Sequence, residues 1–289
     1  MTHDARLDSD SRRHWLQAAA LLPFGGLMAA GALAQDQPEA LARIRARGSL
    51  SVAVYKSMPP FHVDGAGIDV KIAEQLAHEL GVKLNLLPFS AGENMQDDLR
   101  NMVWKGHYLG YGPADVMLHV PVDKPLMDSQ KQVLIFAPYY RESVALAYDI
   151  TQLAQLDSLA DLKGQPIAVA GQTLAGWLLI GADDGAYREQ LTTRMDDGVA
   201  AAQLLLAGKA TVAAGEASEL HSALKGNPRY RIIPMPIPRT SRNGWAVGMA
   251  VKKNATDLAR ALQATVNSMS QDERLAKIFA GHDVPWGAA

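Results

Sequence analysis

Short apolar runs alternate along the chain with segments whose apolar residues recur every three to four positions. In the segment Ile68–Gly81, apolar residues at i, i+4 spacing predict an amphipathic helix that ends at Gly81. Further helices are expected at residues 96–104, 199–207, 256–269 and 271–280. Strands are expected at residues 50–55, 82–89, 114–120, 166–170, 211–214 and 231–233. Strands separated by helices predict βαβ crossovers and a mostly parallel sheet.

The alternation restarts after Val144–Asp149, and an apolar run returns at Trp245–Val251. A second α/β unit, at about residues 145–240, therefore looks inserted into the first. Two crossings, near residues 141–144 and near residues 240–245, would join the two units. The pattern predicts an α/β protein of two lobes.

The first 34 residues have the pattern of a signal peptide. Paired arginines in Ser11–Leu16 precede a mostly apolar stretch, which ends in the small-x-small sequence Ala32–Ala34. This order favours a cleavable, twin-arginine-type signal peptide over a membrane anchor, because the apolar stretch is too short and too rich in Ala and Gly for a spanning helix. We expect a signal peptide at residues 1–34, lobe 1 at residues 35–143 plus 243–289, and lobe 2 at residues 144–242.

Composition narrows the function classes. With 48% hydrophobic and 20% charged residues, the chain is globular and able to bury a core. A net charge of -2 without blocks of like charge argues against nucleic acid or an anionic membrane as partner. The chain has 0 cysteines, which excludes disulfides, thiolate metal ligands and a cysteine nucleophile. No phosphate loop, HExxH or Gly-x-Ser-x-Gly motif occurs, so neither a metal nor a cofactor is expected.

Several short motifs follow one another in a characteristic order. Gly67-Ile68-Asp69-Val70 opens the predicted helix, Pro59-Pro60-Phe61 follows the first strand, and Ala137-Pro138-Tyr139-Tyr140 precedes the first crossing. Asp161-Leu162-Lys163-Gly164 and Gly171-Gln172-Thr173 open the second lobe. Together these motifs resemble the periplasmic solute-binding proteins of family 3, the amino-acid type.

The resemblance implies a venus-flytrap fold, in which lobe 2 is inserted into lobe 1 and a two-strand hinge joins them. It also implies a non-catalytic, monomeric periplasmic protein that binds a small molecule between the lobes and serves an ABC permease. Strand-end loops of α/β sheets independently favour a ligand site there. These loops are residues 56–68, 119–125 and 171–173.

In this family, the loop after the third strand carries an arginine that grips the α-carboxylate of the ligand. Here no arginine occurs from Asn101 to Tyr140, and Lys124 is the nearest cationic substitute. We therefore expect a small polar or weakly acidic ligand that is not an ordinary α-amino acid.

Two alternatives remain open. The stretch Asp115–Pro121 and the sequence Pro138–Arg141 are similar to the MxaJ-like and XoxJ-like branch, which implies an accessory protein of a periplasmic PQQ-dependent alcohol dehydrogenase (methanol oxidation). The insertion Trp104–Gly112 slightly favours such a partner surface. Periplasmic cyclohexadienyl dehydratases share the fold, so a dehydratase with Glu216 as the acid is the less favoured alternative.

The candidate ligand-binding residues come from the strand-end loops of both lobes. Phe61 would stack on a ligand, although it could equally be a core residue, and Thr173 could simply cap a helix. His119 could donate a hydrogen bond, while Asp123 could be only a turn former, and Glu216 corresponds to the residue that takes an ammonium group in the family. The full set is Phe61, His119, Val120, Asp123, Tyr139, Gly171, Gln172, Thr173 and Glu216.

Overall fold

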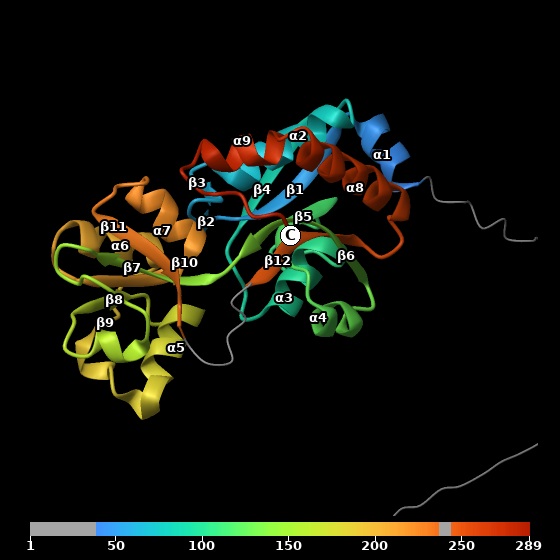
Figure 1. The fold of residues 1–289 in the computed structure, drawn as a ribbon. Coiled ribbons are helices and arrows are strands. Elements are labelled where there is room, and N and C mark those ends of the chain that lie inside the picture. Colours follow the sequence, from blue (N-terminus) through green and yellow to red (C-terminus); the bar gives the residue numbers. More distant parts are fainter. Residues whose placement is uncertain (1–38, 237–243) are drawn as a thin grey trace, which may run out of the picture. The chain divides into compact units, whose positions relative to one another are not determined.

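Two five-stranded sheets organise the chain in this computed structural model, which describes residues 39–236 and 244–289 (Figure 1). The expected signal peptide lies outside the described residues, and so does most of the second crossing. Residues 49–142 and 245–252 supply the first sheet, whereas residues 144–234 supply the second. The second sheet is therefore formed by a segment interrupting the first, as the two-lobe pattern predicts.

The first sheet has the strand order β4-β1-β5-β12-β6. Its strands are β1 (Ser49–Tyr55), β4 (Lys83–Phe89), β5 (Val116–Pro121), β6 (Val133–Glu142) and β12 (Trp245–Lys252). The hairpin β2 (Ser57–Met58) and β3 (His62–Val63) follows β1. The helices of this lobe are α1 (Ala40–Arg47), α2 (Ile68–Glu79), α3 (Met95–Leu99), its π-helical continuation (Arg100–Trp104), α4 (Lys124–Ser129), α8 (Thr256–Gln271) and α9 (Arg274–Ala280).

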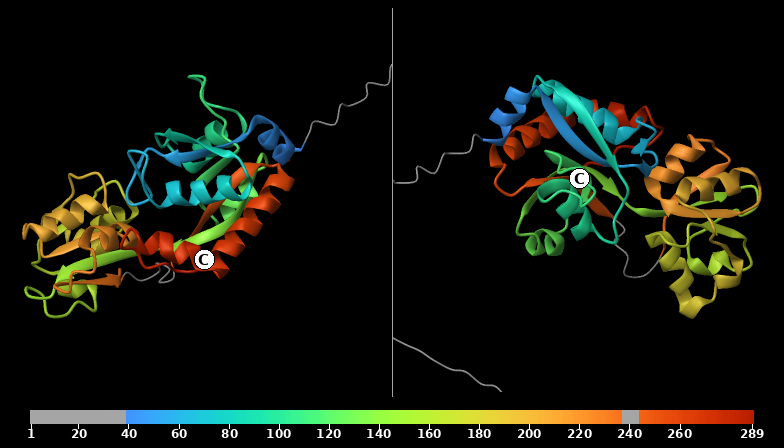
Figure 2. Two further views of the ribbon diagram at one scale, coloured as in Figure 1. Left: turned by 90° about the horizontal axis from the view of Figure 1, so that it is seen from above. Right: turned by 180° about the vertical axis from the view of Figure 1, so that it is seen from behind.

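Each face of the first sheet is covered by helices. Helices α1, α2, α8 and α9 pack on one face, where side chains such as Leu76 and Leu262 are fully buried (Figure 2). The π-helical turn after α3 packs on the other face through Met102 and Val103. Gly67 is the N-cap of α2, and only glycine fits there, because a Cβ would lie 2.2 Å from the carbonyl oxygen of Phe61.

The second sheet has the strand order β11-β7-β10-β8-β9. Its strands are β7 (Val144–Asp149), β8 (Ile167–Val169), β9 (Leu191–Thr192), β10 (Val212–Glu216) and β11 (Tyr230–Pro234). Its helices are α5 (Leu174–Gly181), α6 (Gly198–Leu206) and α7 (Ala217–Leu224), with short 3-10 turns at Leu159–Leu162, Ala182–Gly185 and Arg188–Gln190. Helices α6 and α7 pack on one face and α5 on the other, so this sheet has its own core on both sides.

Each sheet is mostly parallel, as expected, because four of its five strands run in one direction and a single strand, β12 in the first sheet and β7 in the second, runs against them. In the first sheet β1 pairs in parallel with β4 and β5, but β12 is antiparallel to both β5 and β6. In the second sheet β8 pairs in parallel with β10 and β9, whereas β7 is antiparallel to β10 and β11. Strands β7 and β12 each enter a sheet directly from a crossing rather than through a helix, and such a connection does not impose the parallel direction that a βαβ crossover does.

Strand β6 ends at Glu142 and strand β7 begins at Val144, so Ser143 alone separates the two sheets at this crossing. The C-terminal segment runs beside β6. The indole N–H of Trp286 donates to the carbonyl oxygen of Tyr139 at 2.8 Å. The backbone N–H of Arg141 donates to the carbonyl oxygen of Gly287 at 3.2 Å. These contacts fix the C-terminal end of the chain to the strand that leads into the crossing.

Candidate functional site

A cavity of about 570 Å³ lies where the carboxyl ends of β1 and β4 and the end of β5 meet the end of β10. This is the edge at which open α/β sheets bind ligands. Residues of the first sheet and its loops form most of the wall, and Glu216 of the second sheet completes it. The lining residues are Tyr55, Lys56, Ser57, Met58, Phe89, Ser90, Ala91, Met95, His119, Pro121, Glu216 and Trp245. We call this space the main cavity.

Aromatic and thioether side chains dominate the wall of the main cavity. The rings of Tyr55 and Phe89 lie 4.7 Å apart between centroids, and Met95, Met58 and Trp245 extend the apolar surface. The position of Tyr55 is set by its hydroxyl group, which donates to Oδ2 of Asp98 at 2.8 Å. Burial and the neighbouring carboxylate raise the pKa of Tyr55 far above its usual value, so this hydroxyl stays a donor. The wall suits a ligand with an apolar body.

His119 brings a polar ring into this apolar wall. Its side chain is only about 6% exposed, and its Nδ1 lies 3.3 Å from Oδ2 of Asp69 at the start of α2. The hydroxyl group of Tyr139 donates to the other Asp69 oxygen at 2.8 Å and accepts the backbone N–H of His119 at 3.0 Å. Three elements therefore hold His119 in place, and its backbone adopts a positive φ of 60°.

Glu216 lies partly buried at the end of β10, next to the carboxyl groups of Glu142 and Glu219. Glu142, at the end of β6, is fully buried, and Glu219 of α7 accepts the backbone N–H of Glu216 at 2.8 Å. Burial and the charges of Glu142 and Glu219 raise the pKa of Glu216 well above its usual range. Burial also raises the pKa of Glu219 to about 7. Perturbed carboxyl groups that line a cavity are typical of binding and catalytic sites.

Three predicted site residues are buried away from the main cavity. Phe61 is fully buried and packs edge-on against the ring of His119, with centroids 4.2 Å apart. The chain folds back after Phe61, whose amide donates to the carbonyl oxygen of Met58, and this turn directs its ring into the core. Val120 is buried with the opposite core cluster, and Tyr139 acts only behind His119. The expected stacking of Phe61 on a ligand is therefore not what the structure provides.

The loop after β5 also differs from the expectation. Asp123 is the N-cap of α4, and its carboxylate accepts the amide of Leu126 at 3.0 Å. Lys124 pairs with Asp128 at 2.8 Å on the exposed side of that helix. Neither residue lines the main cavity, so Lys124 does not replace the missing arginine there. Of the charged residues that line this cavity within residues 39–236 and 244–289, Lys56 is the cation, at its exposed rim.

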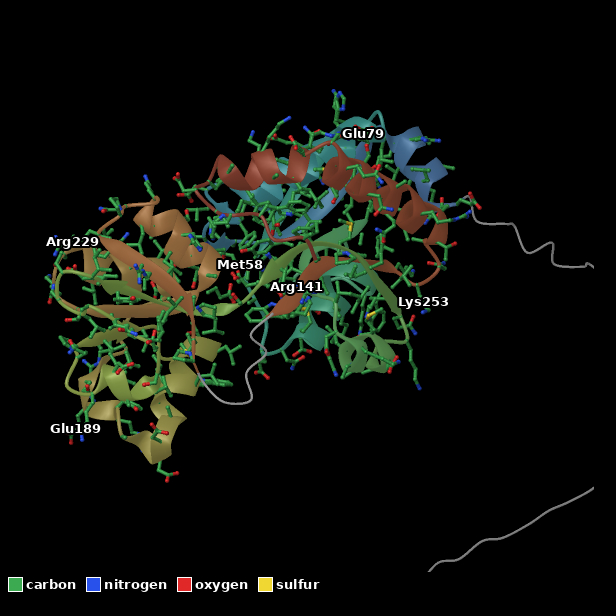
Figure 3. All side chains as sticks on the ribbon, viewed as in Figure 1. Met58, Glu79, Arg141, Glu189, Arg229 and Lys253 are labelled. Atoms are coloured by element: carbon green, nitrogen blue, oxygen red, sulfur yellow. The ribbon has the colours of Figure 1, made fainter. Side chains whose placement is uncertain are left out.

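The loop before α5 borders two smaller hollows instead of the main cavity. Gly171 and Gln172 line one of them together with Arg194. Thr173 lines the other, of about 200 Å³, which it shares with Glu216 and with Met58, the residue labelled in Figure 3. Thr173 is also the N-cap of α5, since its Oγ1 accepts the amide of Gly176 at 3.2 Å. Of the predicted residues, only His119 and Glu216 meet in the main cavity.

Sequence reasoning did not identify the aromatic wall or the buried partner of Glu216. Tyr55 is the last residue of a predicted strand, and a side chain at a strand end can point to either face. Trp245 and Met95 are not among the predicted site residues, but they line the main cavity. Glu142 gave one signal, because it is a carboxylate at the predicted crossing between two apolar runs.

The described ranges, residues 39–236 and 244–289, hold no group of three or more His, Cys, Asp or Glu residues that could bind a metal ion. No helix in these ranges is long and apolar enough to span a membrane.

The chain matches no protein-family model and no curated protein sequence. Solved structures do resemble it. An ancestral cationic amino acid solute-binding protein is 18% identical, with a TM-score of 0.65, and 84% of this chain and 99% of that one are covered.

Two natural proteins are similar to a comparable degree. An amino acid ABC transporter substrate-binding protein from Streptococcus pneumoniae, solved with L-arginine, is 21% identical, with a TM-score of 0.59 and coverages of 85% and 98%. The L-cystine solute receptor of Neisseria gonorrhoeae, in an unliganded open conformation, is 20% identical, with a TM-score of 0.57 and coverages of 86% and 99%. These likenesses confirm the two-lobe α/β fold of periplasmic binding proteins that the sequence motifs indicate.

Proposed function

We propose that this chain is a non-catalytic solute-binding protein of the amino-acid type, exported to the periplasm, where it delivers a small ligand to an ABC permease. The observation that carries this proposal is the main cavity, whose wall comes from strand-end loops of the first lobe and from Glu216 of the second. A ligand in this position contacts both lobes and stabilises their closed arrangement. The fold shared with solute-binding proteins supports the proposal.

The lining of the main cavity supports a small polar or weakly acidic ligand other than an ordinary α-amino acid. An α-carboxylate is best held by the two parallel N–H groups of a guanidinium. Among the described residues that line this cavity there is no arginine, and their cation is Lys56 at the rim. A carboxylate bound there would have only a flexible point charge as its partner.

A thermal-shift screen against small metabolites tests the proposal. A ligand that binds only the native state, at a hundred times its Kd, adds about 2.7 kcal/mol, which corresponds to a rise in Tm of about 5–11 °C for a chain of this size. Trp245→Ala should reduce this rise, because Trp245 lines the main cavity. Trp177→Ala is the matched control, since Trp177 is exposed and does not line this cavity. A broad panel in which no compound raises Tm would contradict solute binding.

Localisation can be tested separately. We expect fractionation to find the mature chain in the periplasm, and replacement of Arg12 and Arg13 by lysine to retain it in the cytoplasm if the twin-arginine route is used. Export that persists in this variant would point to the general secretory route and leave solute binding untouched.

An accessory protein of a periplasmic quinoprotein dehydrogenase is the second candidate. Its supporting observation is the insertion between the π-helical turn and β5, where Tyr108 is 87% exposed and Leu109 is 68% exposed. Exposed apolar side chains next to each other are typical of a protein-binding surface. Under this alternative, the dehydrogenase should co-purify with the chain, and Tyr108→Ser with Leu109→Ser should abolish the association.

A dehydratase is less well supported. It would need an acid and a grip on the substrate carboxylate in the same cavity. Burial and the charges of Glu142 and Glu219 raise the pKa of Glu216, which suits an acid, but the described lining residues include no arginine to hold a substrate carboxylate. We therefore propose binding without turnover.

A further inference from the structure

The apolar wall of the main cavity is organised around two neighbouring aromatic rings. Tyr55 ends β1 and pairs with Phe89, which ends β4, and their ring centroids lie 4.7 Å apart at an interplanar angle of 37°. The hydroxyl group of Tyr55 is already bound to Asp98, so Tyr55 offers its ring to a ligand. Two rings tilted in this way accommodate a third ring in an offset-stacked or edge-to-face contact.

Two thioether side chains and an indole ring extend the same wall. Met58 and Met95 line the cavity, and sulfur atoms make favourable contacts with the edges of aromatic rings. Trp245 lines it as well. A saturated ligand would gain only from the burial of its surface against these side chains, whereas an aromatic ligand would also gain the directional contacts. The wall therefore suits an aromatic ring better than a saturated ring of the same size.

The described ionisable residues place no unbalanced charge inside the main cavity. Lys56 lies at the exposed rim, and a positive charge on His119 would be balanced by Asp69, whose Oδ2 lies 3.3 Å from Nδ1 of the ring. Burial and two neighbouring carboxyl groups raise the pKa of Glu216 well above its usual range, which favours its uncharged form. A charged group on a ligand would lose its hydration here without gaining an opposite charge, which is unfavourable.

A single buried carboxyl group behind the wall holds two parts of it together. Asp98 lies on α3, is only about 4% exposed and does not line the cavity. Its Oδ2 accepts the hydroxyl group of Tyr55 at 2.8 Å, and its Oδ1 accepts the backbone N–H of Gly92 at 2.7 Å. Gly92 follows Ser90 and Ala91, which line the cavity directly after β4. Asp98 therefore fixes the ring of Tyr55 and the loop after β4 relative to each other.

Building on the solute-binding function proposed above, we propose that the main cavity binds an uncharged compound with an aromatic ring, and that Asp98 determines this preference by holding the ring of Tyr55 and the loop after β4 in position. Asp98 does not touch the ligand, so it is a positioning residue. Ser57, Ser90 and His119 line the same cavity and can form hydrogen bonds with a polar group of the ligand, such as a hydroxyl or a carbonyl group.

Calorimetric titration with four compounds of one chain length tests the ligand class: 3-phenylpropan-1-ol, 3-cyclohexylpropan-1-ol, 3-phenylpropanoate and 3-phenylpropylamine. The cyclohexyl ring is the more apolar, so burial alone would favour the cyclohexyl alcohol. We expect the phenyl alcohol to bind about fivefold more tightly than the cyclohexyl alcohol, since each aromatic pair contributes about two- to tenfold beyond burial. At pH 7 it should bind at least about tenfold more tightly than either charged compound.

The ratio of the two alcohol affinities tests the role of Asp98, because a general loss of structure would weaken both alcohols alike. In Asp98→Ala we expect this ratio to fall from about five to about one. Asp98→Asn should keep most of the ratio, since its amide oxygen can accept the N–H of Gly92 and its amide nitrogen can donate to the oxygen of Tyr55. Asp97→Ala is the matched control on the same helix: Asp97 pairs with Arg100 at 2.8 Å, and its loss should leave the ratio unchanged.

Two changes at Tyr55 keep the test decisive if Asp98→Ala does not fold. Tyr55→Phe keeps the ring but releases it from Asp98, so the ratio should fall by about two- to threefold. Tyr55→Leu removes the ring and should bring the ratio to about one. A ratio that is unchanged in both variants would overturn the contact between the ligand and this ring.

Each contrary result overturns a definite statement. Tighter binding of the cyclohexyl alcohol or of a charged compound would overturn the ligand class but would support solute binding in this cavity. An unchanged ratio in Asp98→Ala, or equal losses in Asp98→Asn and Asp98→Ala, would overturn the positioning role of Asp98. If none of the four compounds binds, the ligand class proposed here is wrong, and the broad metabolite screen described above decides on solute binding itself.

Discussion

The hydroxyl group of Tyr139 should contribute more to stability than a single hydroxyl group usually does. It donates to Oδ1 of Asp69 at 2.8 Å and accepts the backbone N–H of His119 at 3.0 Å. All three residues are buried, so no water replaces the hydroxyl group in Tyr139→Phe. Burial and the carboxylate of Asp69 raise the pKa of Tyr139 well above its ordinary value, so the hydroxyl group is a donor at any pH at which the protein is folded.

The expected loss follows from these two bonds. A hydrogen bond to a charged group is worth roughly 1.5–3 kcal/mol, and one between neutral groups is worth roughly 0.5–1.5 kcal/mol. Tyr139→Phe should therefore lower the free energy of unfolding by about 3 kcal/mol, which is a fall in Tm of about 6–12 °C for a chain of this size.

Urea denaturation followed by circular dichroism measures this change, provided that the slope against urea is the same in both proteins. Tyr148→Phe is the matched control, because Tyr148 is equally buried and its hydroxyl group makes no hydrogen bond to the described residues. We expect the control to lose less than about 0.5 kcal/mol. A loss below about 1 kcal/mol in Tyr139→Phe would show that the hydroxyl group does not hold Asp69 and His119 together as described.

Three further predictions concern packing and pH. Gly248→Ala should destabilise the protein by more than about 2 kcal/mol, since a Cβ there would lie 2.5 Å from the carbonyl oxygen of Phe136. A midpoint of thermal unfolding within about 2 °C of that of the unmodified protein would contradict this prediction. Asp149→Asn should lower the free energy of unfolding by about 2 kcal/mol at pH 7, because the Arg229 guanidinium and further hydrogen bonds stabilise the Asp149 carboxylate and lower its pKa. The difference between the two proteins should shrink as the pH falls below about 4. Unfolding curves recorded at both pH values measure it. Glu219→Gln should flatten the pH dependence of Tm between pH 5 and 8. In the unmodified protein the pKa of Glu219 is raised to about 7, so the folded state retains a proton that the unfolded chain loses above about pH 4.3. The stability of the unmodified protein therefore falls as the pH rises through this range. An unchanged pH profile in that variant would exclude Glu219 as the group responsible.

Most of the architecture could be predicted from the sequence, because apolar periodicity reports directly which segments have a buried face. The predicted helix at Ile68–Gly81 and the predicted strands at residues 50–55 and 82–89 all lie within one or two residues of the observed α2, β1 and β4. Strand β6 was not predicted: Pro138 interrupts its apolar run, although the structure accommodates it within the strand.

The site was harder to predict than the fold, because periodicity does not tell which way a loop residue or a strand-end residue points. Phe61 and Tyr55 are both aromatic residues close to the end of β1, yet Phe61 turns into the core and Tyr55 faces the cavity. Phe61 points inward because its amide donates to the carbonyl oxygen of Met58 in a tight turn, whereas Tyr55 is held at the cavity by its hydrogen bond to Asp98. His119 and Glu216 could be found because each is a lone polar residue at the end of an otherwise apolar strand.

The position of β12 in the first sheet has a consequence for how the newly made chain matures. Strand β12 lies between β5 and β6, and it is the strand with which β6 pairs. The N-terminal lobe therefore cannot complete its sheet until the residues up to Lys252 have left the ribosome, whereas all five strands of the inserted lobe are available about twenty residues earlier. Until then β6 presents unpaired backbone groups, which invite association with other chains. A chaperone that shields the nascent polypeptide is needed most during this interval of synthesis.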